Sequence, residues 1–325
     1  MMNLPTGLEN WTLDRLKSVL FFLGKGGVGK TTLSTNFAIY LSKNGFKTYL
    51  ISIDPAHNIA DLLDRKFHKG PNEINSNLVA EELNIDLHLK HTLEKTENNL
   101  KEQYKYLQIL NLENMFNIIK YSPGLQEYSI MQAIHETYNH VLTDFDYLII
   151  DTPPTGLMMR IFNLPKLSLM WLEKLKSLRS KILEKRGVIA HLDKTAFKND
   201  DAAITKKDDM VYKKLKAEIK LAQDIVAIYT GDISKNILIT NEDRLSISEG
   251  LKIIDDLHLL DIEIDLIAVN KSVNVDINSG EKVFHKSSIK NYKKLLIPFY
   301  KSDVPGGMML PYMNKMSHDL GIIKE

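Results

Sequence analysis

The stretch that decides the fold is Gly24-Lys25-Gly26-Gly27-Val28-Gly29-Lys30-Thr31-Thr32. It matches G-x-x-x-x-G-K-[ST], a loop whose glycines turn successive backbone N–H groups towards phosphate oxygens. A strand-like run, 19–23, precedes it, and a helix-like stretch, 31–42, follows it, which is the context that such a loop requires. We therefore expect residues 24–32 to bind a nucleoside triphosphate. In this arrangement Lys30 reaches the β- and γ-phosphates, and the Thr31 hydroxyl ligates Mg²⁺.

Lys25 is a second lysine that the basic loop does not need. In the deviant form of the loop, G-K-G-G-x-G-K-[ST], this lysine reaches phosphates bound in a partner subunit, where its charge supports phosphoryl transfer. The alternative is a solvated loop lysine. The sequence contains no second phosphate loop, so a lysine that acts across subunits requires a homodimer.

Short apolar runs alternate with helix-like segments, as buried parallel strands do in α/β proteins. The runs are 19–23, 48–53, 147–150, 236–239, 264–269 and 295–299. This order predicts an α/β fold with a doubly wound, mostly parallel sheet of the P-loop type. We expect 1–325 to form a single ATPase domain with helical insertions at about 91–143 and 157–230. The polar stretch 194–209 is expected to be a loop.

Two aspartates end strand-like runs, at the sheet edge where ligands bind in such folds. Asp54 is the candidate catalytic group, positioned to orient the attacking water and accept its proton; the alternative is a turn aspartate before a proline. Asp151 is expected to hold Mg²⁺ directly or through water. Gly156, in the turn that follows, is expected to approach the γ-phosphate through its backbone and to act as a switch.

Asn270 ends another strand-like run, and its amide offers a donor and an acceptor that complement the adenine edge. The segment Asn270-Lys271-Ser272-Val273 resembles the guanine-reading Asn-Lys-x-Asp, but Val273 replaces the aspartate. We therefore expect ATP rather than GTP. The alternative for Asn270 is a turn residue.

Composition excludes several classes of site. The chain has no cysteine, which excludes disulfides, thiolate zinc sites and cysteine-held iron–sulfur clusters. Its net charge of +1 gives no reason to expect a nucleic-acid partner. No apolar run approaches the ~18 residues of a membrane-spanning helix. We expect a cytoplasmic protein.

Together these motifs resemble the family of arsenical pump-driving ATPases and of the ATPases that target tail-anchored membrane proteins. The resemblance covers the phosphate loop, a first switch at 54–61, a Pro-Gly-x-x-Glu segment at 123–127 and a second switch at 151–160. It implies a homodimer that depends on Mg²⁺ and ATP and closes when nucleotide binds. In the targeting members, the helical insertions then form an apolar groove for a client.

The sequence also departs from that family. Without cysteine, neither the thiolate site for metalloids nor the Cys-x-x-Cys zinc site at the dimer interface exists, and Leu157 replaces the usual histidine of the second switch. The favoured function is therefore the binding and transfer of an apolar helical client. The rivals are an ATPase subunit that drives an anion or metalloid transporter in the membrane, a positioning ATPase that docks on membrane or DNA, and a biosynthetic enzyme.

The candidate client groove is an apolar stripe of Leu167, Met170, Trp171 and Leu175. The alternative is that these side chains belong to the core. A ~20-residue apolar helix needs a groove ~30 Å long. We expect that length to exceed what one insertion supplies, so that dimerisation is required.

Overall fold

The computed structural model describes residues 16–54, 59–91, 93–94, 124–193, 203–273, 292–300 and 309–323. The chain folds into two compact units. The first contains Met1–Arg160 and Asp232–Glu325, and the second contains Ile161–Gly231. Most of the insertion expected at about 91–143, namely residues 92 and 95–123, and residues 194–202 of the expected polar loop lie outside the described residues.

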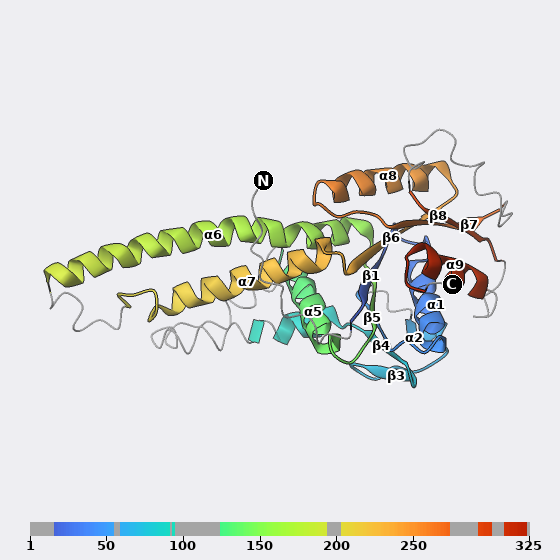
Figure 1. Cartoon of the computed structure of the whole chain (residues 1–325), viewed down its shortest axis with the longest axis horizontal. Helices are drawn as coiled ribbons and strands as arrows, with labels where there is room; N and C mark the ends of the chain where they lie inside the picture. The colour runs from blue at the N-terminus through green and yellow to red at the C-terminus, as the bar shows by residue number, and fades with distance from the viewer. Residues whose placement is uncertain are drawn as a thin grey trace. The chain divides into compact units, whose positions relative to one another are not determined.

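The first unit is built on a sheet that has eight strands within the described residues, in the order β3-β4-β2-β5-β1-β6-β7-β8 (Figure 1). The strands are β1 (Ser18–Leu23), β2 (Thr48–Ser52), β3 (Asn72–Asn75), β4 (Leu78–Glu82), β5 (Tyr147–Asp151), β6 (Ser234–Asn241), β7 (Leu266–Ser272) and β8 (Lys294–Pro298). Neighbouring strands are parallel except for β3 and β4, which are antiparallel. The predicted α/β class and mostly parallel sheet are confirmed.

The central strands are apolar because helices cover the sheet. Every side chain of β2 and β5 is buried, which explains why these strands appear as unbroken apolar runs in the sequence. The described helices of this unit include α1 (Lys30–Lys43), α2 (Ile59–Leu62), α5 (Leu125–Val141), α8 (Arg244–His258) and α9 (Leu310–Asp319), and residues 85–91 are also helical. The Tyr40 hydroxyl of α1 donates a hydrogen bond to Asn314 Oδ1 of α9 over 2.7 Å.

All six strand predictions correspond to observed strands, and each differs from its strand by one to three residues at one or both ends. β3 and β4 are not among the six predicted runs. Three of the four residues of β3, Asn72–Asn75, are polar, and the strand is only alternately half-buried, because it lies at the edge of the sheet. Such an edge strand lacks the apolar run that marks a central one.

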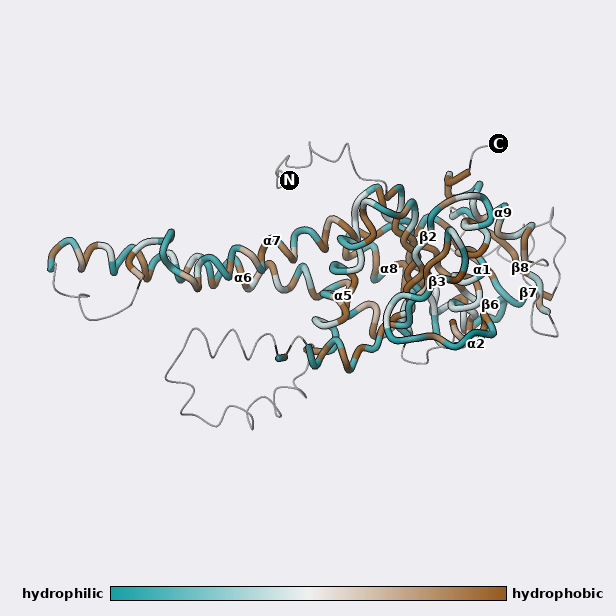
Figure 2. Tube along the Cα trace, turned by 90° about the horizontal axis from the view of Figure 1, so that it is seen from below, coloured by the Kyte–Doolittle hydropathy of each residue, from teal (hydrophilic) through white to brown (hydrophobic). Residues whose placement is uncertain are grey.

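The second unit consists of the larger part of α6 (Thr155–Leu192) and of α7 (Met210–Thr230), which lie side by side (Figures 1 and 2). The guanidinium of Arg179 on α6 binds the Asp209 carboxylate at the start of α7, with Nε 3.1 Å from Oδ1. The same carboxylate caps α7 by accepting the Tyr212 N–H at 2.6 Å. Asp209 therefore links α6 to α7 through Arg179 and is also the N-cap residue of α7.

The length of α6 corrects one expectation. The helix has 38 residues and tolerates Pro165 inside it, so it extends about 57 Å at 1.5 Å per residue. One insertion therefore exceeds the ~30 Å that an apolar segment of ~20 residues needs. The requirement for dimerisation does not follow from length.

Among the described residues, no helix has both the length and the apolar character that a membrane span requires.

Candidate functional site

The phosphate loop joins β1 to α1 and has glycine where the backbone requires it. Gly24 has φ +147°, and a Cβ there would lie 2.4 Å from the Ile239 carbonyl oxygen of the neighbouring β6. Gly29 has φ +98°, and a Cβ would lie 2.4 Å from Asn270 Nδ2. These contacts seat both ends of the loop against the sheet, while Lys25, Gly26 and Gly27 remain exposed.

Lys30 is the first residue of α1, and only 5% of it is exposed. Its Nζ donates to the carbonyl oxygen of Lys25 over 3.3 Å, so the side chain folds back over the loop. Burial lowers the pKa of Lys30, and the charges of Asp151 and Asp54 oppose that shift. Lys30 therefore lies within electrostatic reach of both aspartates, and the roles assigned to these residues stay predictions.

Asp151 is the last residue of β5 and is fully buried. Burial raises its pKa to about 6, although the Thr31 and Ser52 hydroxyls and the charge of Lys30 pull it down. The Ser52 hydroxyl donates to Oδ2 over 3.1 Å, whereas Oδ1 is buried and has no hydrogen-bond partner among the described residues. A buried carboxylate with one such oxygen near the Thr31 hydroxyl is suited to a hard divalent cation.

Asp54 follows β2 at the same edge of the sheet. Ser52 lies opposite Asp151 in the β2–β5 register, and the Ile53 N–H donates to the Asp151 carbonyl over 2.9 Å. The charge of Asp54 raises the pKa values of both Lys30 and Asp151, which places its carboxylate within electrostatic reach of the loop. Residues 55–58 of the first switch lie outside the described residues.

The second switch leads from β5 directly into α6. The Thr152 hydroxyl donates to the Phe22 carbonyl over 2.7 Å, which fixes the turn against β1. Gly156 is the second residue of α6, where backbone N–H groups have no partner within the helix. Its N–H is therefore of the kind that can meet a phosphate oxygen, and that contact stays a prediction.

Lys25 has a partner that the sequence did not indicate. Its Nζ lies 3.0 Å from Glu249 Oε1 on α8. Both side chains are partly exposed, and pairs of this kind contribute only about 0–1 kcal/mol. A stronger ligand, such as a phosphate, can therefore displace Glu249 from Lys25.

Asn270 lies beneath the loop. It is 9% exposed, its Nδ2 donates to the Val28 carbonyl over 2.8 Å, and its Oδ1 accepts the Lys271 N–H. The Lys271 ammonium donates to the Gly27 carbonyl over 2.9 Å, a contact that sequence reasoning missed. Both polar ends of Asn270 thus hold backbone groups, and its proposed contact with adenine remains a prediction.

The four residues of the candidate client surface lie on α6, and all are exposed. Leu167 and Leu175 are nearly half exposed, and Met170 and Trp171 are 65% and 69% exposed. The interpretation of these side chains as core is therefore not supported for the chain alone.

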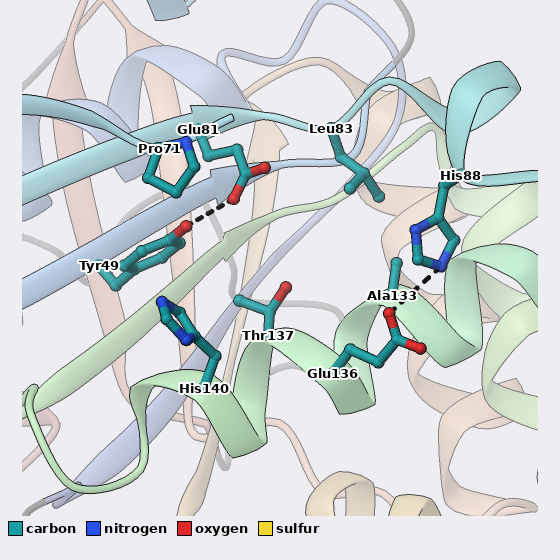
Figure 3. Close-up of a pocket in the computed structure, with 9 residues that line it drawn as sticks. All are labelled: Tyr49, Pro71, Glu81, Leu83, His88, Ala133, Glu136, Thr137 and His140. Carbon is teal, nitrogen blue, oxygen red and sulfur yellow. Dashed lines mark hydrogen bonds and ion pairs between the residues drawn. The ribbon is translucent and has the colours of Figure 1, made fainter. Parts of the chain in front are cut away.

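A separate cavity of about 230 Å³ lies between the β2–β4 region and α5 (Figure 3). Its lining residues are Tyr49, Pro71, Glu81, Leu83, His88, Ala133, Glu136, Thr137 and His140. The Tyr49 hydroxyl donates to Glu81 Oε2 over 2.5 Å, and His88 Nε2 lies 3.8 Å from Glu136 Oε2. Burial lowers the pKa of His88, against the pull of Glu136. No phosphate-loop residue lines this cavity.

Comparison with known proteins gives consistent matches. The model of a family described as "Anion-transporting ATPase" matches residues 17–300. "Putative arsenical pump-driving ATPase 2" of Aquifex aeolicus is 26% identical over 310 residues, which are 91% of this chain and 98% of that protein. "ATPase get3" of Schizosaccharomyces japonicus is 35% identical over 182 residues, covering 55% of this chain and 53% of that protein.

Proposed function

The chain belongs to the anion-transporting ATPase family and is an ATPase, and from that premise we propose that it works as a homodimer whose ATP cycle controls the binding and release of an apolar helical client. The client class is a membrane segment such as a tail anchor. The observation that carries this proposal is the exposed apolar stripe on α6, a helix that begins at the second switch.

The hydrolytic part of the proposal assigns a role to each residue at the loop. Lys30 and the loop N–H groups hold the β- and γ-phosphates, and Thr31 and Asp151 hold Mg²⁺, which neutralises charge on the phosphates. Asp54 orients the attacking water and takes its proton. The buried Oδ1 of Asp151 and the charge of Asp54 beside Lys30 support these roles.

Lys25 completes the site of the partner subunit in this proposal. Its only described ion-pair partner, Glu249, holds it in the same subunit through a weak, partly exposed contact. When two subunits close on ATP, the phosphates of the partner's nucleotide offer Lys25 a stronger charge-assisted contact. Hydrolysis then depends on closure.

The apolar stripe is long enough for a membrane segment. The exposed large apolar side chains of α6 are Leu167, Met170, Trp171, Leu175, Leu178, Ile182, Val188, Ile189 and Leu192. The positions 167, 171, 175, 178 and 182 follow one another at three- and four-residue steps, which places them on one face of the helix. From 167 to 189 the helix rises about 33 Å, close to the ~30 Å of a bilayer core.

The names of several relatives, which call them putative arsenical pump-driving ATPases, supply the rival function. The chain has no cysteine with which to bind a metalloid as a thiolate complex. Stimulation of ATP hydrolysis by arsenite, antimonite or an oxyanion would favour the rival over client binding.

The test replaces Met170 and Leu175 by aspartate and measures capture of a ~20-residue apolar helical peptide with lysine flanks, with ATP and with ADP. Because both side chains are exposed in the free chain, we expect capture to fall tenfold or more, the effect of ~1.4 kcal/mol or more of lost apolar contact. Hydrolysis without peptide and Tm should stay unchanged.

Two controls make this result specific. Ser180→Asp adds an acidic group at a polar, partly exposed position on the opposite side of the same helix, and capture should persist. Leu183→Asp alters a side chain that is 2% exposed, and Tm should fall strongly. If the Met170→Asp/Leu175→Asp variant captures the peptide as well as the wild type does, this surface is not the client-binding site.

A further inference from the structure

The second switch makes an ion pair with α5 that the hydrolytic site does not use. Arg160 Nε lies 3.2 Å from Glu127 Oε1. Glu127 stands in the first turn of α5, and its side chain is only 11% exposed, whereas that of Arg160 is 67% exposed. The nearly buried carboxylate of Glu127 on α5 therefore pairs with the solvent-exposed guanidinium of Arg160 on α6, its one ion-pair partner among the described residues.

The difference in exposure means that Glu127 depends more on this ion pair than Arg160 does. A carboxylate that has lost most of its contact with water depends more strongly on its ion-pair partner, because an uncompensated buried charge is unfavourable. Water can replace the partner of Arg160, whose side chain is 67% exposed, far more readily than the partner of Glu127, whose side chain is 11% exposed. If Arg160 moves, keeping the ion pair requires Glu127 to move with it. Because Glu127 lies in the first turn of α5, that helix would move as well.

Arg160 moves with the switch because both lie on one helix. α6 begins at Thr155, directly after the Asp151–Pro154 turn, and is continuous through Arg160. The hydrogen bonds of an α-helix make such a short segment rigid. A displacement of Gly156 towards or away from a γ-phosphate is therefore passed to Arg160.

α5 has room to respond. Ala133, Glu136, Thr137 and His140 of this helix border the cavity of about 230 Å³ (Figure 3). One polar contact that α5 makes there, His88 Nε2 to Glu136 Oε2, spans 3.8 Å, longer than a hydrogen bond. Close packing elsewhere resists movement, and an open cavity beside a helix reduces that resistance.

We propose that Glu127 is a positioning residue that couples the second switch to α5 through its ion pair with Arg160. When bound nucleotide changes the position of the second switch, α5 then moves with it. Because α5 lies at the carboxyl end of the insertion 91–143, the change is passed on to that insertion. The inference rests on the proposed role of the second switch in sensing nucleotide. It assigns a function to the Pro-Gly-x-x-Glu segment, whose proline, Pro123, lies outside the described residues and whose glutamate is Glu127.

The experiment is hydrogen exchange of the α5 backbone amides, in the free protein and with Mg²⁺ and a non-hydrolysable ATP analogue. In the wild type we expect nucleotide to change α5 exchange rates by about fivefold or more, since local opening equilibria report such shifts. In Glu127→Gln and Arg160→Gln we expect less than about a twofold change. Affinity for the analogue should stay within about threefold of wild type.

A charge exchange separates pairing from general damage. Glu127→Arg combined with Arg160→Glu should recover at least half of the α5 response that either single reversal abolishes. Lys235→Gln is the matched control, because it removes an ion pair of the same unit, Lys235 Nζ to Asp265 Oδ1 at 3.1 Å. Its α5 response should equal that of the wild type.

Two results would overturn the inference: an α5 response of wild-type size in Glu127→Gln and Arg160→Gln, or no nucleotide response of α5 in the wild type. If Glu127→Gln lowers Tm strongly, Arg160→Gln decides, because its site is exposed. Failure of client capture in the wild type would refute the proposed function and leave the α5 measurement intact, since that measurement needs only nucleotide binding.

Discussion

Asn270→Ala separates two roles that the sequence and the structure suggest for one side chain. The sequence predicts that Asn270 contacts adenine, and the structure shows it bonded to the Val28 carbonyl and the Lys271 N–H at 2.8 and 2.9 Å. Removing two buried hydrogen bonds costs about 1–3 kcal/mol at ~0.5–1.5 kcal/mol each. If that free energy supports the phosphate-binding form of the loop, phosphate affinity should fall about 5- to 150-fold.

The assay compares equilibrium binding of ATP, GTP and inorganic tripolyphosphate to wild type and variant. Loop support predicts that all three affinities fall by similar factors, because all three ligands use the loop. Asn236→Ala is the control: Asn236 is also buried and donates to the Glu263 carbonyl over 2.9 Å, near the start of β6 and away from the loop. It should lower Tm and leave the three affinities unchanged.

A selective loss of ATP binding, with tripolyphosphate binding unaffected, would refute loop support and establish adenine contact as the role of Asn270. Equal affinities in variant and wild type would refute both roles. The comparison is decisive because tripolyphosphate has no base.

Three further predictions concern the catalytic groups and the second unit. Asp54→Asn should keep ATP binding near normal while kcat falls by ~10² or more; steady-state hydrolysis within a few-fold of wild type would contradict the assigned role. An inactive Lys25→Ala subunit mixed with an inactive Lys30→Ala subunit should regain part of the activity, because some mixed dimers contain one site with both lysines; no recovery in verified mixed dimers would place Lys25 in its own subunit's site or outside catalysis. Asp209→Ala should destabilise the second unit by about 1–3 kcal/mol through loss of the Arg179 ion pair and the α7 cap. Because Arg179 holds the pKa of Asp209 below its ordinary value of 3.8, the wild-type contribution is present above pH ~3.8 and is lost as pH falls through the folded-state pKa, a slope in chemical unfolding that the variant should lack.

Local patterns in the sequence were enough to predict the nucleotide core. Buried parallel strands must be apolar on both faces, so β1, β2 and β5 are marked by their own residues. The phosphate loop is likewise specified locally, because only glycine fits its backbone at Gly24 and Gly29. The placement of Asp54 and Asp151 then follows, since the carboxyl ends of parallel neighbours meet at one edge.

Long-range partners could not be predicted in this way. Glu249 pairs with Lys25 across 224 positions, and Lys271 bonds to Gly27 across 244. Nothing in the local pattern of either residue indicates its partner, because the contact exists only once α8 and β7 are placed beside the loop. The same holds for the Glu127–Arg160 pair, which joins two helices.

The unbroken length of α6 is not apparent from the sequence. Gly156 and Pro165 both suggest interruptions, yet the helix continues through them. Gly156 occupies the first turn, where its N–H needs no helical partner. Pro165 is buried, and the packing around it can outweigh one missing backbone hydrogen bond.

Because α6 is one unbroken helix, the exposed apolar stripe and the end of the second switch lie on the same rigid element. A two-helix hairpin can bury one face of each helix, and α7 buries Ile219, Ala222 and Ile225 while α6 leaves Met170 and Trp171 exposed. A permanent cover, such as a second copy of the chain, would protect that stripe equally in every nucleotide state. The proposed client would have to be bound and released, so its surface would have to respond to hydrolysis. Because α6 starts directly after the proposed nucleotide-sensing turn and carries the stripe, it would meet that requirement with no additional linking element.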